Sequence, residues 1–217
     1  MGLERILFRF SKEGEARFLS HHDLLRLFER AVRRAQLPVR MSEGYNPHPK
    51  IRVLCALPVG VEAEDEPLEV EFDEAVDADV ARDRLAEQLP AGIAVRSAER
   101  LSGRPSRTVA AMAYEAELPG SEPLTGADVE RFLARDAIGV ERERGTEHRM
   151  IDIRPALEVL RLDGRRLHFR LRAGARGTPK AVEVVAALLG RPVGGDPHIR
   201  VRRTQVSLSG AQPPSER

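Results

Sequence analysis

The 217-residue chain is poor in the residues that hold metal clusters, cross-links or stacked bases. It has one cysteine, Cys55, no tryptophan, and an aromatic content of 4%. A single cysteine excludes an internal disulfide framework and an iron–sulfur cluster held by this chain alone, because such clusters need several thiolates. The scarcity of aromatic side chains argues against a surface that stacks successive bases of a single strand.

Long apolar runs and nucleotide-binding motifs are missing as well. No stretch approaches the ~20 apolar residues of a membrane helix, and the N-terminus does not resemble a signal peptide. The sequence contains no Walker loop, no G-x-G-x-x-G, no C-x-x-C and no H-E-x-x-H motif. We therefore expect a cytoplasmic protein without membrane contact, and we predict no metal site.

The formal net charge is only +1, but charge is unevenly distributed along the chain. Residues 1–100 contain 15 basic and 19 acidic residues, whereas residues 101–217 contain 20 and 15. Between residues 60 and 90 there are 2 bases against 12 acids. Such asymmetry concerns partners rather than fold, so the acidic segment 62–87 is a candidate contact for a basic partner.

A short basic helix is predicted after Ser20. Ser20 and Asp23 have the spacing of a capping box, and Pro38 ends the helical pattern. The apolar stripe consists of Leu24, Leu27, Phe28, Ala31 and Ala35. The polar side carries Arg26, Arg30, Arg33 and Arg34. Guanidinium groups bind phosphate oxygens through paired hydrogen bonds, so this side is either a phosphate-binding face or a solvated one.

The next stretch, residues 41–50 (MSEGYNPHPK), predicts a rigid polar loop. Two prolines flank His48, and Gly44 permits a backbone conformation that other residues avoid. Such a loop often positions a ligand, and the alternative is a capped crossover between a helix and a strand. The candidate binding residues here are Ser42, Tyr45, Asn46, His48 and Lys50.

Histidines offer one route to catalysis. A neutral His21 or His48 near arginines could act as general base in a metal-independent endoribonuclease, similar in outline to CRISPR-type repeat endoribonucleases. His21 and His22 point about 100° apart on a helix, so the two rarely reach one metal ion.

The order of predicted elements is β-α-β-β-α-β, and it occurs twice. Strands are expected near 6–10, 51–59, 68–72 and 93–95, with helices near 20–35 and 77–89. After a linker at 102–106, strands follow at 113–118, 150–159, 167–171 and 199–206, with helices at 125–133 and 179–189. The sequence thus predicts an α+β protein of two tandem ferredoxin-like domains, 1–101 and 107–209, with a disordered tail, 210–217. Residues 140–150 interrupt the repeat as an extra hairpin or a mobile basic loop.

Two further candidate stretches lie in the second half of the chain. Asp152 and Arg154 should share one face of a strand, where they would form a salt bridge at the domain junction or hold a ligand together. Arg200, Arg202 and Arg203 would extend the basic surface.

Several segments together resemble a family of bacterial domains associated with radical-SAM proteins. They are F-S-K-x-G, F-L-S-H-x-D, R-R-A-x-L-P, S-x-G-Y-N-P-H-P-K and, later, D-I-R-P. His22 departs from the family pattern, which usually has an apolar residue there. The resemblance implies a radical-SAM partner that carries the iron–sulfur cluster, S-adenosylmethionine and, in cobalamin-type members, cobalamin, with no cofactor on this chain.

The function that these observations favour is a non-catalytic binding module for RNA modification. It would bind a phosphate-rich polymer, structured or ribosome-related RNA, for a radical-SAM enzyme. The alternatives are a protein–protein adaptor without RNA and the histidine-dependent endoribonuclease.

Overall fold

The computed structural model describes residues 4–101, 107–120, 123–144, 147–174, 178–194 and 196–209. The chain forms two compact units. Unit 1 comprises residues 1–108 and 209–217, and unit 2 comprises Val109–Leu208. The expected linker 102–106 and the expected tail 210–217 lie outside the described residues.

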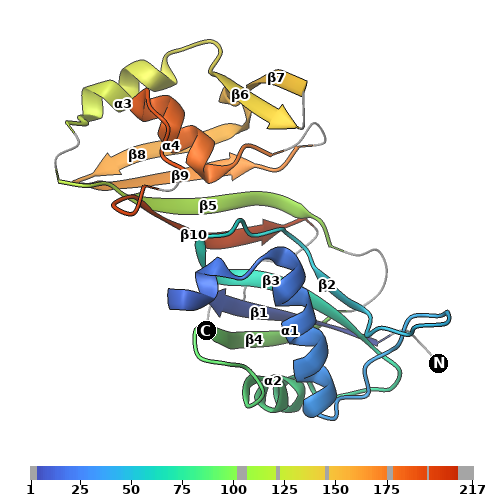
Figure 1. Ribbon diagram of the computed structural model, residues 1–217. Helices are drawn as coiled ribbons and strands as arrows, with labels where there is room; N and C mark the ends of the chain where they lie inside the picture. The colour runs from blue at the N-terminus through green and yellow to red at the C-terminus, as the bar shows by residue number, and fades with distance from the viewer. Residues whose placement is uncertain are drawn as a thin grey trace. The chain divides into compact units, whose positions relative to one another are not determined.

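Unit 1 is built on an antiparallel sheet with two helices (Figure 1). Its elements are β1 (Glu4–Lys12), the 3-10 helix η1 (Gly14–Phe18), α1 (His21–Arg34), β2 (Ile51–Val53), β3 (Glu62–Phe72), α2 (Ala78–Ala86) and β4 (Ile93–Leu101). Strand β1 lies between β4 and β3, and the short β2 also pairs with β3. Alternation in β1 turns Ile6, Phe8 and Phe10 toward the core shared with both helices. There, the rings of Phe10 and Phe28 meet edge to face, 4.9 Å apart.

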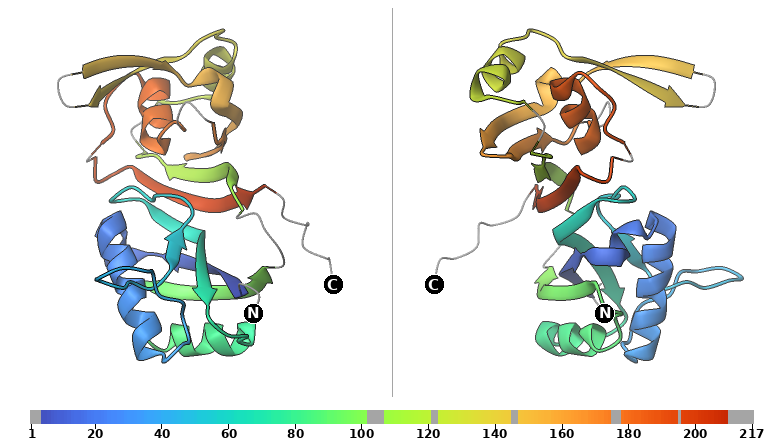
Figure 2. Two further views of the ribbon diagram at one scale, coloured as in Figure 1. Left: turned by 90° about the vertical axis from the view of Figure 1, so that its right-hand side faces the viewer. Right: turned by 60° about the vertical axis from the view of Figure 1, so that its left-hand side comes forward.

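Unit 2 has the same kind of sheet and a separate hairpin (Figure 2). Its elements are β5 (Val109–Glu117), α3 (Gly126–Leu133), β6 (Gly139–Arg144), β7 (Glu147–Asp152), the 3-10 helix η2 (Arg154–Ala156), β8 (Leu157–Asp163), β9 (Arg166–Arg172), α4 (Ala181–Leu189) and β10 (Arg200–Leu208). The sheet order is β10-β5-β9-β8, and β6 pairs with β7 as a hairpin. The stacked rings of Tyr114 and Phe169, 5.3 Å apart, are buried in this unit.

The mixed α/β class and several predicted helix ends are confirmed. Ser20 caps α1 by accepting a hydrogen bond from the Asp23 N–H. Thr125 and Asp128 form a capping box at the start of α3, where the sequence predicts a helix from residue 125. Gly190 ends α4 with a φ of 66°, a left-handed conformation that glycine adopts without strain. Residues 139–144 pair with residues 147–152 as the hairpin that was one of the two expectations for this region.

Three predicted boundaries are wrong, each for a local reason. The strand expected at 51–59 is only Ile51–Val53, because the chain bends away from the sheet before Pro58. The strand expected at 150–159 is broken by η2, where Pro155 cannot donate to a strand ladder. Pro179 is not the first helical residue: α4 begins at Ala181, with Lys180 before it. Among the described helices, none is long and apolar enough to cross a membrane.

The strand expected at 68–72 begins earlier, within the acidic stretch after residue 60. Residues Glu62–Glu66 form the first part of β3, because their carboxylates find partners within unit 1. Glu62 accepts from the Gly14 N–H at 3.1 Å, and Asp65 accepts from Arg9 at 3.2 Å. A strand can therefore carry this run of acids without leaving all of its charge exposed.

Candidate functional site

Three arginines of α1 line a groove of about 640 Å³ in unit 1. They are Arg26, Arg30 and Arg34, spaced four residues apart, so each lies about one helical turn beyond the last. The remaining wall residues are Leu19, Asp23, Leu27, Glu87, Gln88, Leu89 and Pro90. The groove thus lies between α1 and the segment that follows α2.

The groove arginines differ in how they are paired. The Arg34 guanidinium donates to the Gln88 carbonyl oxygen at 2.6 Å, which ties α1 to the opposite wall. Within the described part of the chain, Arg26 and Arg30 make no hydrogen bond or ion pair, and both are exposed. Their donors are therefore available to a ligand.

Two carboxylates moderate the charge of the groove. The Ser20 hydroxyl donates to Asp23 at 2.6 Å, and this hydrogen bond lowers the pKa of Asp23 and keeps it ionised. Asp23 therefore faces Arg26 as an anion already held by the helix cap, and Glu87 is the second acid on the wall. Three guanidinium groups against two carboxylates leave a net positive groove.

Arg33 is the predicted α1 binding residue that does not line this groove. At about 100° per residue, Arg33 lies about 100° around the helix from Arg34 but only about 20° from Arg26, so the angle around the helix is not what separates Arg33 from the groove. Arg33 is exposed, and no partner is described for it. Of the four arginines predicted on the polar side of this helix, three therefore line the groove and Arg33 does not.

The loop 41–49 projects from unit 1 and is closed at its base (Figure 2). Met41 and Pro49 form an isolated β-bridge. The Ser42 N–H donates to the His48 carbonyl at 2.8 Å, and the His48 N–H donates to the Ser42 hydroxyl at 2.9 Å. Gly44 has a φ of +127°, in the region that glycine tolerates best. Ser42, one of the predicted binding residues, therefore holds the base of the loop together.

The side chains at the tip of this loop are open to solvent. Glu43, Asn46 and His48 are exposed, and Tyr45 is 100% exposed. Lys50 follows the loop, and its Nζ atom lies 3.7 Å from Oε2 of Glu71 on β3. None of these residues lines the arginine groove, so the helix and the loop form two separate features of unit 1.

The candidate catalytic histidines are not grouped with the arginines. His21 and His22 lie with their rings 5.9 Å apart and inclined by 68°. The His21 Nδ1 atom is buried and has no hydrogen-bond partner in the described structure. Neither His21 nor His48 lines the groove. The described residues also contain no group of three or more histidine, cysteine or carboxylate side chains placed to hold a metal ion.

Asp152 and Arg154 do not share a strand face as predicted, because β7 ends at Asp152 and η2 begins at Arg154. Asp152 accepts hydrogen bonds from the N–H groups of Ile138 and Arg154 at 2.8 and 3.0 Å. The Arg154 guanidinium donates to the carbonyl oxygens of Leu133 and Leu157. These bonds join the hairpin, α3 and β8 inside unit 2, which is a structural role.

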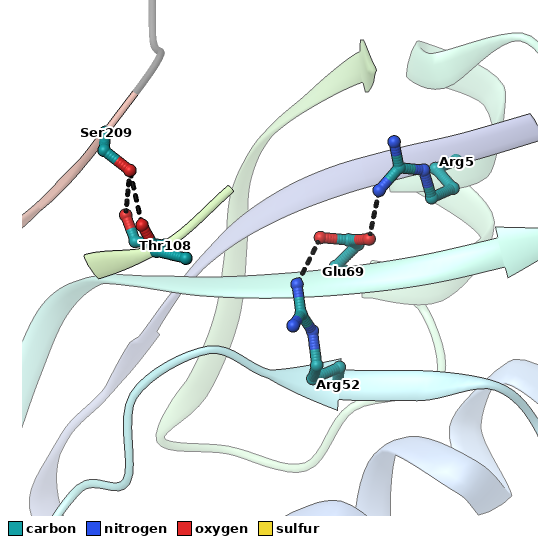
Figure 3. A network of polar contacts seen from close by, with 5 residues as sticks. All are labelled: Arg5, Arg52, Glu69, Thr108 and Ser209. Carbon is teal, nitrogen blue, oxygen red and sulfur yellow. Dashed lines mark hydrogen bonds and ion pairs between the residues drawn. The ribbon is translucent and has the colours of Figure 1, made fainter. Parts of the chain in front are cut away.

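Sequence reasoning missed the buried charges. Glu69 on β3 accepts from Arg5 on β1 at 2.8 Å and from Arg52 on β2 at 2.9 Å (Figure 3), and Arg5 and Glu69 are each only 4% exposed. Lys12 is fully buried and donates to the carbonyl oxygens of Arg17 and Leu19. Arg203, expected on the basic surface, is 1% exposed and lies over the Tyr114 ring. The sequence signal for such buried ion pairs is a pair of opposite charges on neighbouring strands. This signal can be used only when the register of the strands is known.

The chain leaves unit 1 after Thr108 and returns to it at Ser209, and these two residues are hydrogen-bonded to each other. The Ser209 N–H donates to the Thr108 carbonyl at 2.8 Å, and their hydroxyl groups are hydrogen-bonded to each other (Figure 3). Both residues belong to unit 1. This contact therefore closes unit 1 at the two points where the chain leaves it and returns.

The comparisons with known proteins identify a family but no activity. The family model described as "Uncharacterized protein conserved in bacteria" (DUF2344) matches residues 5–183. The chain belongs to this family. No curated protein matches the chain.

One similar solved structure is described as an unknown protein from Galdieria sulphuraria. The match covers 95% of this chain and 99% of that one, at 16% sequence identity and a TM-score of 0.28. A likeness at this level carries no argument about fold or function.

Proposed function

We propose that this protein is a non-catalytic module that binds a phosphate-rich polymer, structured RNA, through the groove of α1. The observation that carries the proposal is the row of Arg26, Arg30 and Arg34 in one groove, with the first two unpaired among the described residues. From Arg26 to Arg34 the helix rises about 12 Å, a length over which one nucleic-acid strand presents about three phosphates. A guanidinium group matches a phosphate through two parallel hydrogen bonds.

The adaptor alternative has less support from the part of the acidic segment that lies in β3. Glu62, Asp65, Glu69 and Glu71 all face basic side chains of unit 1 within ion-pair distance. Carboxylates that are paired internally offer less charge to a basic partner. The groove arginines are in the opposite situation, which favours an anionic partner.

The wider setting follows the resemblance to radical-SAM-associated domains. The module would present its RNA in the cytoplasm to a radical-SAM enzyme that carries the iron–sulfur cluster and S-adenosylmethionine. Each unit would be a ferredoxin-like domain. The order β4-β1-β3 with β2 on β3, and the order β10-β5-β9-β8 with an inserted hairpin, support this assignment.

The test is the salt dependence of RNA binding by the full chain. Fluorescence polarisation with a labelled RNA hairpin should give an affinity that falls steeply with salt, because bound arginines release counterions. Arg26→Gln combined with Arg30→Gln should weaken binding about tenfold or more at low salt and reduce the slope of log affinity against log salt by about 1–2.

Arg33→Gln is the matched control, since it removes an exposed, unpaired arginine from the same helix outside the groove. It should change binding much less than the double variant. A wild-type affinity for RNA with no salt dependence, or equal losses for the control and the groove variant, would overturn the proposal.

A further inference from the structure

Loop 41–49 has the structure of a preorganised recognition element. Its base is held by the Met41–Pro49 bridge and by the two hydrogen bonds between Ser42 and His48. A loop that is already ordered loses little conformational entropy when it binds a ligand, which raises affinity.

The tip presents a single aromatic ring among polar groups. Tyr45 is 100% exposed, and its neighbours Glu43, Asn46 and His48 are also exposed. Protein-binding aromatic anchors are normally surrounded by other side chains that exclude water, whereas most of the side chains exposed with Tyr45 at positions 43–48 are polar. A tyrosine in a loop that also exposes an amide and an imidazole suits one nucleobase, which has a face that stacks and an edge that hydrogen-bonds.

We infer that the tip of loop 41–49 binds one unpaired base of the RNA, with Tyr45 stacked on the base and Asn46 and His48 at its edge. This inference rests on the proposed function, because it assumes that the groove arginines bind the RNA phosphates. It adds the substrate class: RNA with a loop, bulge or single-stranded end. Bases within an A-form helix are shielded in a deep, narrow groove, so a fully paired duplex offers the tip nothing.

The test compares two RNAs with the same number of phosphates, one a hairpin with an unpaired loop and the other a blunt duplex. Wild-type protein should prefer the hairpin. Tyr45→Ala should lose about tenfold in hairpin affinity and most of the preference, while its salt slope stays unchanged. Tyr45→Phe keeps the stacking ring and should retain the preference. Because the Tyr45 side chain is fully exposed, these variants should fold normally, as circular dichroism can verify.

A spectroscopic readout reports stacking directly. The chain has no tryptophan, so Tyr45→Trp places a single indole at the tip that can be excited where RNA absorbs little. Adding the hairpin should quench its emission strongly, and adding the duplex should not.

The outcomes separate the two proposals. If Tyr45→Ala keeps the hairpin preference, or if the indole is not quenched while groove variants lose affinity, the base-binding inference is overturned and the groove remains. If wild-type protein binds neither RNA, the proposed function itself fails. If Tyr45→Ala leaves RNA binding intact but abolishes nuclease-resistant capture of a protein, the loop is a protein-docking element and the inference is wrong.

Discussion

Arginines on helix α1 and arginines on the strands are the same residue type in opposite situations. Several strand arginines meet carboxylates: Arg5 and Arg52 share Glu69, and Arg170 and Arg172 share Glu158. On α1, Arg26, Arg30 and Arg33 have no partner among the described residues. The paired strand arginines thus hold the structure together, whereas Arg26, Arg30 and Arg33 have no partner in the described structure and are available to bind.

This difference changes how the charge of the chain should be interpreted. The second half has the larger excess of basic residues, which suggests that the basic surface is there. Much of that charge is neutralised locally in unit 2, by pairs such as Arg142–Glu183 and Arg191–Asp196. The available cations of α1 instead lie in the half whose net charge is negative.

The largest effect should come from removing a carboxylate that serves buried arginine. Glu69→Gln should lower the free energy of unfolding by about 3 kcal/mol, because the Arg5 guanidinium then lacks its charged acceptor inside the protein. Urea denaturation measures this loss. Arg52→Ala is the control: Arg52 is 50% exposed and should cost less than about 1 kcal/mol. Equal losses for the two variants would mean that burial is not what distinguishes these pairs.

A smaller effect is expected at the hairpin of unit 2. The Arg142 guanidinium donates to both oxygens of Glu183 at 2.6 Å and to the Thr178 carbonyl at 2.9 Å, which joins β6 to α4. Arg142→Gln should cost about 2 kcal/mol and increase hydrogen exchange in 139–152. Arg149→Gln, an exposed change on β7 of the same hairpin, should leave exchange unchanged. If both variants exchange alike, the Arg142–Glu183 pair does not hold the hairpin.

Glu158 should show a pH dependence with a definite sign. Arg172 and then Arg170 lower the pKa of Glu158 below its ordinary value. A carboxyl with a lowered pKa stabilises the folded state fully above its unfolded pKa, about 4.3 for glutamate, and that stability is lost as pH falls through the folded pKa. The stability difference between wild type and Glu158→Gln should therefore be constant above about pH 5 and shrink below about pH 4. A difference that grows on acidification would contradict the assigned direction.

The smallest effect on stability is expected at the groove. Arg26→Gln and Arg30→Gln, singly or together, should leave the free energy of unfolding within about 0.5 kcal/mol of wild type, because no described contact is lost. Thermal unfolding would measure this. A large loss would show that these arginines are structural like those on the strands, and the comparison would fail.

Local signals made much of the fold predictable. The caps at Ser20 and Thr125, the glycine at position 190 and the alternation of β1 all correspond to elements of the structure. Boundaries were wrong where a proline or a distant charge decides them, as at Pro155 and in the acidic start of β3. Of the candidate site, the residue types on α1 and in the loop were predictable. Their division into a groove and a separate loop was not, because the opposite wall of the groove comes from residues 87–90.

The amino-acid sequence by itself determined the basic helix, its cap, and the closed base of loop 41–49, because each depends on residues within a few positions of one another. The tertiary structure decided which arginines are paired with a carboxylate of the protein. Arg5 and Glu69 are 64 positions apart and meet only through the pairing of β1 with β3. Whether a charged side chain stabilises the fold or is available to a ligand depends on such long-range neighbours. Strand register and packing determine which neighbours it has.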